Sequence, residues 1–290
     1  MSSISLRSAL ETTPVAYGFW LTEENELTYL LQPPQCPIAK TILRRSPEFS
    51  EGGFSWVLVD AEHGLINDSH YYELTNAVGH EGASPIIRVP WPEEWMIKRA
   101  LDAGAHGVMT PMCHSANANL YLSAQQEDAA KVVSYCKYPP VGVRGYGPMF
   151  TPHSFPGVKP AEYDEKTHNE VMVIVQIESR PGVENVEEIA KVEGLDVLFI
   201  GPFDLAKQMR VTRGGEEHEA AIQRVLNAAR SAGKKAAIFC SDGDDALRRI
   251  QQGFDMVSIT TDVAVFGDGM LNELEKAKGS SKVQGKRDGY

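Results

Sequence analysis

The fold is decided by two apolar stretches of the sequence, VMVIVQIE at residues 171–178 and VLFIGPFD at residues 197–204. Each stretch is almost unbroken in its hydrophobicity, and each ends in a carboxylate, Glu178 in the first and Asp204 in the second. Runs of this kind are typical of parallel β-strands that are covered on both faces. Residues 180–190 between them have helical spacing and acidic side chains, so the whole segment is predicted to form a β-α-β unit.

The two terminal carboxylates predict a metal site. Because neighbouring parallel strands end at the same edge of a sheet, Glu178 and Asp204 are expected to lie side by side. Two ionised carboxylates in one place repel each other, which costs free energy unless a positive charge intervenes. Divalent cations prefer oxygen ligands of this type, so the pair is predicted to bind one.

Strand-like runs alternate with helical stretches along the rest of the chain. Further runs lie at residues 16–20, 56–60, 85–89, 107–111, 235–240 and 255–260, with helical spacing at 93–103 and 216–231. Eight such units without hairpin signals favour an α/β fold, a (β/α)8 TIM barrel with expanded loops and a C-terminal helix. The alternative is a doubly wound open sheet, whose ligand would lie where the strand order reverses.

The chain is expected to form a single TIM-barrel domain over residues 1–290, with a catalytic core at about 14–275 and a flexible tail at 276–290. Residues 22–54 and 113–126 look expanded for a barrel of this kind, and residues 139–169 are rich in Gly and Pro. Long loops at the carboxyl end of a barrel usually act as lids or substrate walls. These three segments are therefore expected to shape the specificity of the site.

Composition excludes several classes of protein. The 290 residues carry a formal net charge of −11, which argues against nucleic acid as a partner. No apolar stretch of 18 residues is present, so no membrane span is predicted. Four cysteines without C-x-x-C spacing indicate free thiols in a reducing, cytoplasmic location: Cys36, Cys113, Cys136 and Cys240. The acid-poor residues 1–10 leave a transit peptide open as an alternative.

Polar side chains follow the predicted strand at residues 56–60. Asp60 ends this strand and His63 follows three residues later, where it would lie over the mouth of the barrel. A carboxylate can orient and charge a catalytic imidazole, so Asp60 is a candidate partner for His63. The alternative is that Asp60 caps a turn and His63 is a polar loop residue. Glu62 is expected to point away and to pair with a surface or neighbouring cation.

Arg88 and Gln176 are also expected to face the barrel mouth. A guanidinium at this position needs an anion, which could be a substrate carboxylate, a developing enolate, or an ion pair with Asp60 or Glu178. Gln176 lies two residues before Glu178 and therefore on the same side of the strand. Its amide could donate to a bound carboxylate or satisfy interior backbone groups. No lysine ends a predicted strand, which argues against Schiff-base chemistry.

Together, these motifs resemble the HpcH/HpaI aldolase family. The resemblance runs in order through DAEHG at 60–64, RVP at 88–90, LDAGA at 101–105, PPVGVRG at 139–145, QIE at 176–178 and GPFDL at 201–205. Members of this family are metal-dependent class II pyruvate aldolases on a TIM barrel. They include 4-hydroxy-2-oxoheptanedioate aldolase, 2-keto-3-deoxy-sugar-acid aldolases and, more distantly, macrophomate synthase.

The resemblance implies a role for each matching residue. Glu178 and Asp204 would hold Mg²⁺ or Mn²⁺, with Co²⁺ or Zn²⁺ as alternatives. Arg88 would neutralise the enolate oxygen of pyruvate, and His63, steered by Asp60, would act as an acid and base on the C4 hydroxyl through a metal-bound water. The substrate carboxylate would be received by Gln176 and by the backbone amides near Phe203 and Asp204.

The resemblance also implies an assembly. Asp102 matches an acid that reaches into the site of a neighbouring subunit, which implies a homo-oligomer, either a hexamer or a trimer. Phe203 departs from the family, which usually has a small residue at this position, so its ring would narrow the pocket or turn outward. The departure concerns the aldehyde half of the site and leaves the metal and pyruvate half intact.

Three hypotheses for function follow. The first is a class II aldolase that cleaves or forms a 4-hydroxy-2-oxo acid from pyruvate and an aldehyde, with small molecules as its partners. The second is an oxaloacetate-type decarboxylase or enolate-trapping lyase, because the same enolate has to be stabilised. The third is a non-catalytic barrel that binds a 2-oxo acid, which the loss of Arg88 or of a metal ligand would have favoured.

Overall fold

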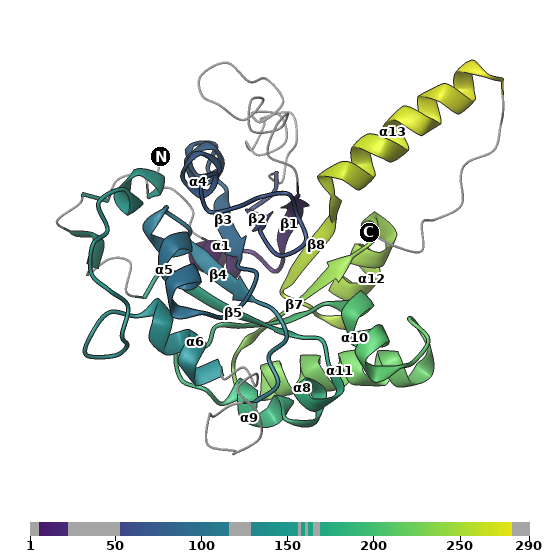
Figure 1. Ribbon diagram of the computed structural model, residues 1–290. Coiled ribbons are helices and arrows are strands. Elements are labelled where there is room, and N and C mark those ends of the chain that lie inside the picture. The colour runs from purple at the N-terminus through teal and green to yellow at the C-terminus, as the bar shows by residue number, and fades with distance from the viewer. Residues whose placement is uncertain are drawn as a thin grey trace.

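The computed structural model describes residues 6–22, 53–115, 129–155, 158–159, 162–164 and 169–279. Eight parallel strands form a closed barrel in the order β1 to β8, with β8 paired to β1 (Figure 1). The predicted (β/α)8 TIM barrel is therefore confirmed, and the open doubly wound sheet is excluded. Most of residues 22–54 and 113–126, the loops expected to be expanded, lie outside the described residues, as does the tail beyond residue 279.

The strands begin and end close to the predicted apolar runs. They are β1 Ala16–Leu21, β2 Trp56–Asp60, β3 Ser84–Arg88, β4 Gly107–Thr110, β5 Met172–Ile177, β6 Val197–Ile200, β7 Lys235–Cys240 and β8 Met256–Thr261. The run that ends in Asp204 was expected to be a strand throughout, and this was wrong. The strand β6 ends at Ile200, because Pro202 starts a helix and lacks the N–H that would continue the ladder.

Helices cover the outside of the barrel. They are α1 Leu6–Thr12, α4 Tyr71–His80, α5 Glu94–Asp102, α6 Ala129–Cys136, α8 Arg180–Glu184, α9 Val186–Ala190, α10 Pro202–Met209, α11 Glu216–Ser231, α12 Gly243–Gln252 and α13 Asp262–Ala277, with the short 3₁₀ helix η1 at Thr151–Ser154. Residues 180–190 were expected to form one helix. Instead the helix breaks at Asn185, whose side-chain amide donates to the carbonyl of His114.

The interior of the barrel is filled by large apolar side chains. Trp20, Trp56 and Phe199 lie within this inner core and pack edge to face or tilted against one another. Gly18 is required opposite Trp56, because a side chain at residue 18 would collide with the indole ring. The amino-terminal end of the barrel is closed by α1, which adds Leu6 and other apolar residues to the inner core.

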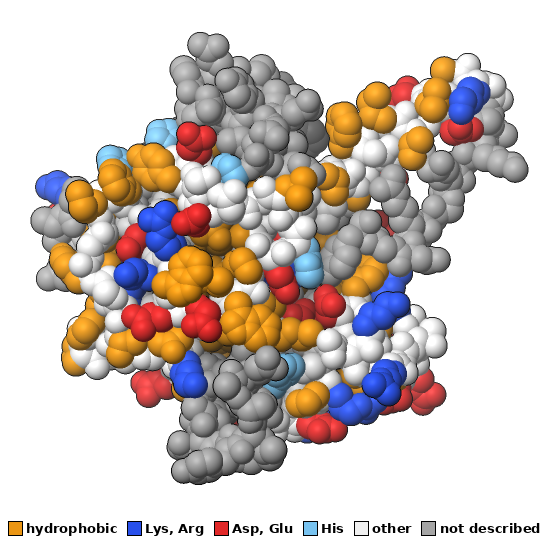
Figure 2. Space-filling model, in the orientation of Figure 1, with side chains coloured by type: hydrophobic (Ala, Val, Ile, Leu, Met, Phe, Trp, Pro, Cys, Tyr) orange, Lys and Arg blue, Asp and Glu red, His pale blue; other side chains and the backbone are white. Residues whose placement is uncertain are grey.

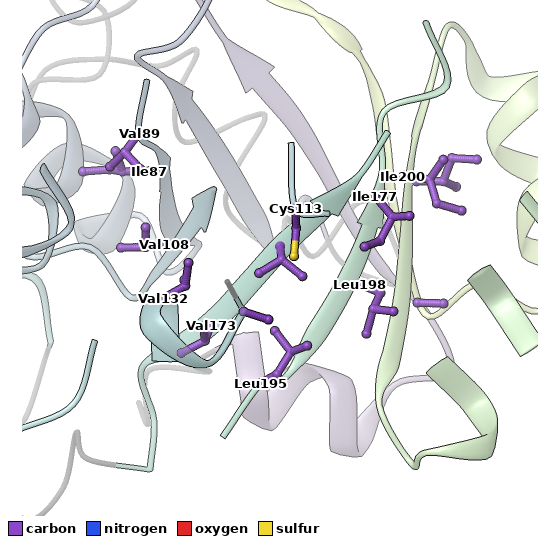
Figure 3. Packing of buried hydrophobic residues seen from close by; sticks show 14 of the residues in the cluster. Ile87, Val89, Val108, Cys113, Val132, Val173, Ile177, Leu195, Leu198 and Ile200 are labelled. Carbon is purple, nitrogen blue, oxygen red and sulfur yellow. The ribbon is translucent and has the colours of Figure 1, made fainter. Parts of the chain in front are cut away.

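A second apolar layer lies between the strands and the surrounding helices (Figure 3). Outward-facing residues such as Val173 and Leu198 contact helical residues such as Val132, and nearly all of them are fully buried. Inward and outward side chains alternate along each strand, so this layer and the inner core hold every strand from both sides. The ends of the strands, and with them the polar residues that follow, are thereby placed rigidly.

The last helix, α13, departs from this pattern. It follows β8 directly and has no buried residue, and it projects away from the barrel (Figure 1). Apolar side chains are exposed along it, as the projecting arm in Figure 2 shows. Among the described residues, no helix combines the length and the apolar character needed to cross a lipid bilayer. Three cysteines are described, and all three are buried: Cys113, Cys136 and Cys240.

Candidate active site at the carboxyl end of the barrel

A buried ion pair joins the ends of β2 and β3. Arg88 donates from Nε to Asp60 Oδ1 over 2.8 Å and from Nη2 to Asp60 Oδ2 over 2.6 Å, which is the bidentate geometry of a strong pair. Both side chains are only 1% exposed, and the register of the barrel sets Asp60 opposite Arg88. Of the anions considered for Arg88 from the sequence, the structure therefore provides Asp60. The guanidinium also lies 4.2 Å from the centroid of the Trp20 ring.

Glu62 turns toward the same guanidinium. Its Oε2 atom lies 2.8 Å from Arg88 Nη1, and its side chain is mostly buried. The sequence predicted a partnership with a neighbouring cation, which is what occurs, but the expected outward direction was wrong. Burial raises the pKa of the Glu62 carboxyl, while the charge of Arg88 acts to lower it. Arg88 thus forms ion pairs with two carboxylates, Asp60 and Glu62.

Gln176 connects this pair to Glu178. Its Oε1 accepts a hydrogen bond from Arg88 Nη1 over 3.3 Å, and its Nε2 donates to Glu178 Oε2 over 3.2 Å. The other oxygen of Glu178 accepts from the backbone N–H of Met112 over 2.9 Å. Met112 has a positive φ of 54°, which a side chain of its size rarely adopts, and this directs its N–H toward the carboxylate. Hydrogen bonds thus connect the side chains of Arg88, Gln176 and Glu178 in a row, and all three side chains are buried.

Glu178 is a buried carboxylate whose charge is not balanced. Burial raises its pKa to about 8, and the hydrogen bond from Met112 and the charge of Arg88 only partly oppose this. The negative charges of Asp204 and Glu62 raise the pKa further. Arg88 cannot neutralise Glu178 fully because its hydrogen bonds are directed to Asp60 and Gln176, and it also forms an ion pair with Glu62. A positive charge beside Glu178 would therefore be stabilised.

Asp204 lies in the first turn of α10, close enough to Glu178 for the two charges to affect each other. Gly201 precedes this helix, and a side chain there would collide with Glu178 Oε2. Among the described residues, no group of three or more His, Cys, Asp or Glu side chains is arranged as a metal site. Glu178 and Asp204 fit a cation that takes only two ligands from the protein and the others from substrate and water, a mode typical of Mg²⁺.

His63 lies at the rim of the mouth with its side chain half exposed. Its Nε2 is 3.7 Å from Glu62 Oε1, and its backbone N–H donates to Asp60 Oδ1 over 3.3 Å. The structure thus brings His63 to the predicted end of the barrel. The steering of its imidazole by Asp60 stays a prediction, because the Asp60 carboxylate binds Arg88 and the backbone of residues 62 and 63.

Asp102 is not brought together with the other candidates. It ends α5 before β4 begins, so it lies toward the amino-terminal end of the barrel, whereas Glu178 follows the carboxyl end of β5. Its carboxylate accepts from Arg144 Nη2 over 2.8 Å within the same chain, and its backbone carbonyl accepts from Thr151. Through these contacts Asp102 holds the segment around Arg144 in place. Its predicted reach into a neighbouring subunit stays a prediction.

Phe203 forms one side of the mouth. Its ring is partly buried against the inner core and lies 6.0 Å from the ring of Phe239, which in turn lies 4.9 Å from Trp20. Of the two orientations considered for this side chain, the structure therefore favours the inward one. The narrowing of the pocket by this ring stays a prediction.

Two histidines near the site were not predicted to matter. His114 Nδ1 lies 2.6 Å from the hydroxyl of Ser179, which caps α8 and directly follows Glu178. His218, which is 1% exposed, joins the start of α11 to the start of α10 through the carbonyl of Pro202. His218 follows no predicted strand, so the strand-end rule that found Glu178 could not find it. His114 lies three residues after the predicted strand at 107–111, as His63 does after 56–60, but no metal-ligand spacing distinguished it in the sequence.

The eight β-α units close into a barrel whose carboxyl end holds the guanidinium of Arg88, the amide of Gln176 and the carboxylates of Asp60 and Glu178. Fold and site together define a TIM-barrel enzyme. Comparison with known proteins agrees. A family model described as HpcH/HpaI aldolase/citrate lyase matches residues 47–268. The chain belongs to this family, and it is accordingly a carbon–carbon lyase.

Named relatives share 35% and 30% sequence identity with this chain. The chain is 35% identical to a hydroxypyruvate/pyruvate aldolase of Agrobacterium fabrum over 243 residues, which cover 82% of this chain and 86% of the relative. It is 30% identical to a 5-keto-4-deoxy-D-glucarate aldolase of Shigella boydii, with 90% and 91% covered. A family structure from Burkholderia cenocepacia superposes with a TM-score of 0.77 at 29% identity, covering 94% of this chain and 98% of the other.

Proposed function

We propose that the protein is a class II aldolase, dependent on a divalent metal, that cleaves or forms a 4-hydroxy-2-oxo acid from pyruvate and an aldehyde. The observation that carries this proposal is the buried row of Arg88, Gln176 and Glu178, which ends in a carboxylate with a raised pKa. Such a row offers hydrogen-bond donors and a cation-binding oxygen within one desolvated site. Those are the groups that a 2-oxo acid and its enolate require.

Each residue has a part in this proposal. Glu178 and Asp204 would hold Mg²⁺ or Mn²⁺, which, when bound, supplies positive charge beside the oxygen that becomes the enolate. Arg88 would stabilise the same oxygen with an N–H that already points along the row, and Asp60 keeps the guanidinium in place. Gln176 and the first backbone amides of α10 would orient the carboxylate of the 2-oxo acid.

His63 is the proposed carrier of the proton that leaves the C4 hydroxyl during cleavage. Its imidazole is half exposed, and its Nε2 lies 3.7 Å from Glu62 Oε1. The same site could serve a decarboxylase, but decarboxylation has no hydroxyl proton to remove. A requirement for His63 therefore separates the two chemistries.

We also propose that the protein assembles as a homo-oligomer in the cytoplasm. Support for assembly comes from α13, a helix without buried residues that exposes apolar side chains. Asp102, whose match first suggested assembly, is bonded within its own chain and lends no further support. The free, buried thiols of Cys136 and Cys240 are consistent with a reducing compartment.

The proposed activity is tested by pyruvate release from a panel of 4-hydroxy-2-oxo acids and oxaloacetate, with Mg²⁺ or Mn²⁺ and then with EDTA. Cleavage of a hydroxy-oxo acid that EDTA abolishes and added metal restores is the expected result. Turnover of oxaloacetate alone, unaffected in a His63→Ala variant, would instead indicate a decarboxylase. Cleavage that persists in EDTA after dialysis would contradict the metal assignment.

A further inference from the structure

Residues 112–114 follow β4 and lie directly against Glu178. The backbone N–H of Met112 donates to Glu178 Oε1 over 2.9 Å, beside the bond that Oε2 receives from Gln176. Met112 makes this contact with a φ of 54°, a strained conformation that persists only where surrounding contacts hold it. Whatever holds residues 112–114 in place therefore also sets the direction of the N–H that Glu178 receives.

The backbone of Cys113 ties this segment to residues on both sides of Glu178. Its N–H donates to the carbonyl of Gln176 over 3.0 Å. Its carbonyl lies so close to Gly182 that a Cβ added there would be 2.6 Å away, so only glycine permits the approach. The side chain of Cys113 enters the outer apolar layer, as Figure 3 shows. The segment thus lies along the chain from just before the carboxylate to just after it.

His114 adds a side-chain contact to the same stretch. Its Nδ1 lies 2.6 Å from the hydroxyl oxygen of Ser179, the residue directly after Glu178. Ser179 is 2% exposed, and its hydroxyl also accepts from the N–H of Gly182 over 3.1 Å at the start of α8. Either tautomer of a neutral imidazole can complete the contact, because a hydroxyl both donates and accepts. His114 is thereby fixed to the immediate neighbour of Glu178.

Asn185 holds the backbone of His114 from the far end of α8. Its Nδ2 donates to the His114 carbonyl over 2.9 Å, across 71 residues of sequence. Asparagine between two helices often caps the second one, but the side chain of Asn185 makes no capping bond to α9. Asn185 is exposed, so its amide is directed to this long-range contact without being confined by the core.

We propose that His114 and Asn185 are positioning residues for metal binding at Glu178. They hold residues 112–114 against the chain that follows β5, and the N–H of Met112 in turn keeps the carboxylate in the orientation that takes a divalent cation. A carboxylate that is already oriented loses less conformational freedom on binding, which raises the affinity. This inference rests on the proposed function, in which Glu178 is a metal ligand.

Isothermal titration of the full-length protein with Mn²⁺ tests the inference. His114→Ala removes the contact with Ser179, and Asn185→Asp replaces a donor by an acceptor that repels the His114 carbonyl. Each variant is expected to bind Mn²⁺ about 3- to 10-fold more weakly, the equivalent of one lost hydrogen bond. His114→Asn should stay within about twofold of the wild-type affinity, because its amide can still bond the Ser179 hydroxyl. Since Asn185 is exposed, its variant keeps the test open if His114→Ala fails to fold.

Asn76→Asp is the matched control for Asn185→Asp. The Nδ2 of Asn76 also donates to a backbone carbonyl, that of Tyr72 on α4, over 2.7 Å. This variant should keep the wild-type affinity for Mn²⁺ whatever its effect on the melting temperature. A purely structural role for His114 and Asn185 would lower the melting temperature of the metal-free protein and leave its affinity for Mn²⁺ unchanged, and that result would overturn the inference.

Failure of the inference can be told apart from failure of the proposed function. Glu178→Gln tests the ligand assignment itself. If Glu178→Gln loses Mn²⁺ binding but His114→Ala and Asn185→Asp keep the wild-type affinity, the inference is wrong and the proposed function stands. If Glu178→Gln binds Mn²⁺ as tightly as the wild type, the metal assignment falls and the inference falls with it.

Discussion

Two buried carboxylates of the site have opposite electrostatic surroundings. Asp60 is held by a bidentate hydrogen bond from Arg88, and two backbone N–H groups add to it. Glu178 receives only neutral donors, Met112 N–H and the amide of Gln176, and burial raises its pKa to about 8. The first carboxylate is therefore suited to positioning a cationic side chain, and the second to binding a cation from solution.

Replacing Glu178 by Gln separates these roles. The variant is expected to lose metal binding and at least about 100-fold in kcat, because the developing charge loses its electrostatic partner. Its metal-free form should melt at the same or a higher temperature near pH 7. A carboxyl whose pKa is raised in the folded state costs stability as pH rises from 4.5 toward 8, and the amide removes that cost.

Isothermal titration with Mn²⁺ and a thermal melt check this prediction together. Glu184→Gln, at an exposed position on α8, is the matched control and should change neither property. A Glu178→Gln variant that still binds Mn²⁺ with wild-type affinity would show that Glu178 is not a ligand.

The Arg88–Asp60 pair predicts non-additive effects on stability. Arg88→Met should lower the free energy of unfolding by about 3–5 kcal/mol, because Asp60 is left buried without its partner. Adding Asp60→Asn should restore much of that loss, since the uncompensated charge disappears. Neither variant should cleave substrate. Denaturant unfolding combined with the pyruvate assay measures both, and a double variant that is no more stable than the single one would argue against the pair as the cause.

Individual elements are joined at the amino-terminal end of the barrel by His106, which directly precedes β4. Leu6 N–H on α1 donates to Ser84 Oγ over 2.7 Å, and that hydroxyl lies 3.2 Å from His106 Nδ1. His106 Nε2 lies 2.7 Å from the carbonyl of Ser154, and the ring stacks on Phe155. Nε2 therefore carries the proton donated to the carbonyl, and in the neutral ring Nδ1 accepts from the Ser84 hydroxyl. One side chain thus connects α1, β3 and η1.

This contact predicts acid lability. Burial lowers the pKa of His106 to about 4, so the folded protein resists a proton that the unfolded chain takes up near pH 6.5. Stability from this group is complete above pH 6.5 and is lost as pH falls to 4, by up to about 3 kcal/mol. His106→Gln should be less stable at pH 7 but should show a flatter pH dependence across this window.

Urea unfolding between pH 4 and pH 7 measures the effect. His80→Asn, at an exposed histidine on α4, serves as the comparison and should follow the wild-type curve. A wild-type protein and a His106→Gln variant with parallel curves would rule out His106 as the source of the acid lability.

At the scale of the whole molecule, the described helices leave one side of the barrel without cover. The outward-facing side chains of the adjoining strands β1 and β8 include Tyr17, which is 40% exposed, and Ile259, which is partly exposed. The helix that follows β8, α13, projects away from them (Figure 1). It presents an apolar stripe with helical spacing that includes Phe266 and Met270, both more than half exposed. The two surfaces are complementary in character, so α13 of one copy is suited to cover another.

If α13 forms the interface between copies, charged substitutions in its apolar stripe should weaken self-association. Phe266→Glu combined with Met270→Glu should weaken self-association by at least about 100-fold, because two large apolar contacts are replaced by charges. Sedimentation velocity over a range of micromolar concentrations measures this. Leu247→Glu, at an exposed leucine on α12, should leave the assembly intact. Wild-type protein that sediments as a monomer throughout would remove the basis for assigning α13 to an interface.

Much of the barrel and of the site could be predicted from the sequence. The strands are apolar because they are buried on both faces, so their order and approximate ends are visible in the hydrophobic pattern. Arg88, Gln176 and Glu178 could be found because each lies at or near a strand end. Asp204 was found by the same rule, although it belongs to a helix. Helix α1 was missed, because the acid-poor start of the chain drew attention to targeting instead of to its apolar spacing.

What the sequence determined by itself is the class of fold and the end of the barrel at which the polar residues collect. Both follow from local patterns that repeat along the chain. The tertiary structure alone decided that Arg88 binds Asp60 and Glu62, that Asp102 is held by Arg144, and that Arg213 lies over Phe203. The Arg88 and Asp102 contacts join segments far apart in the chain, and the last joins the first turn of α10 to the connection that follows this helix. All depend on barrel closure and side-chain orientation, which no spacing rule specifies.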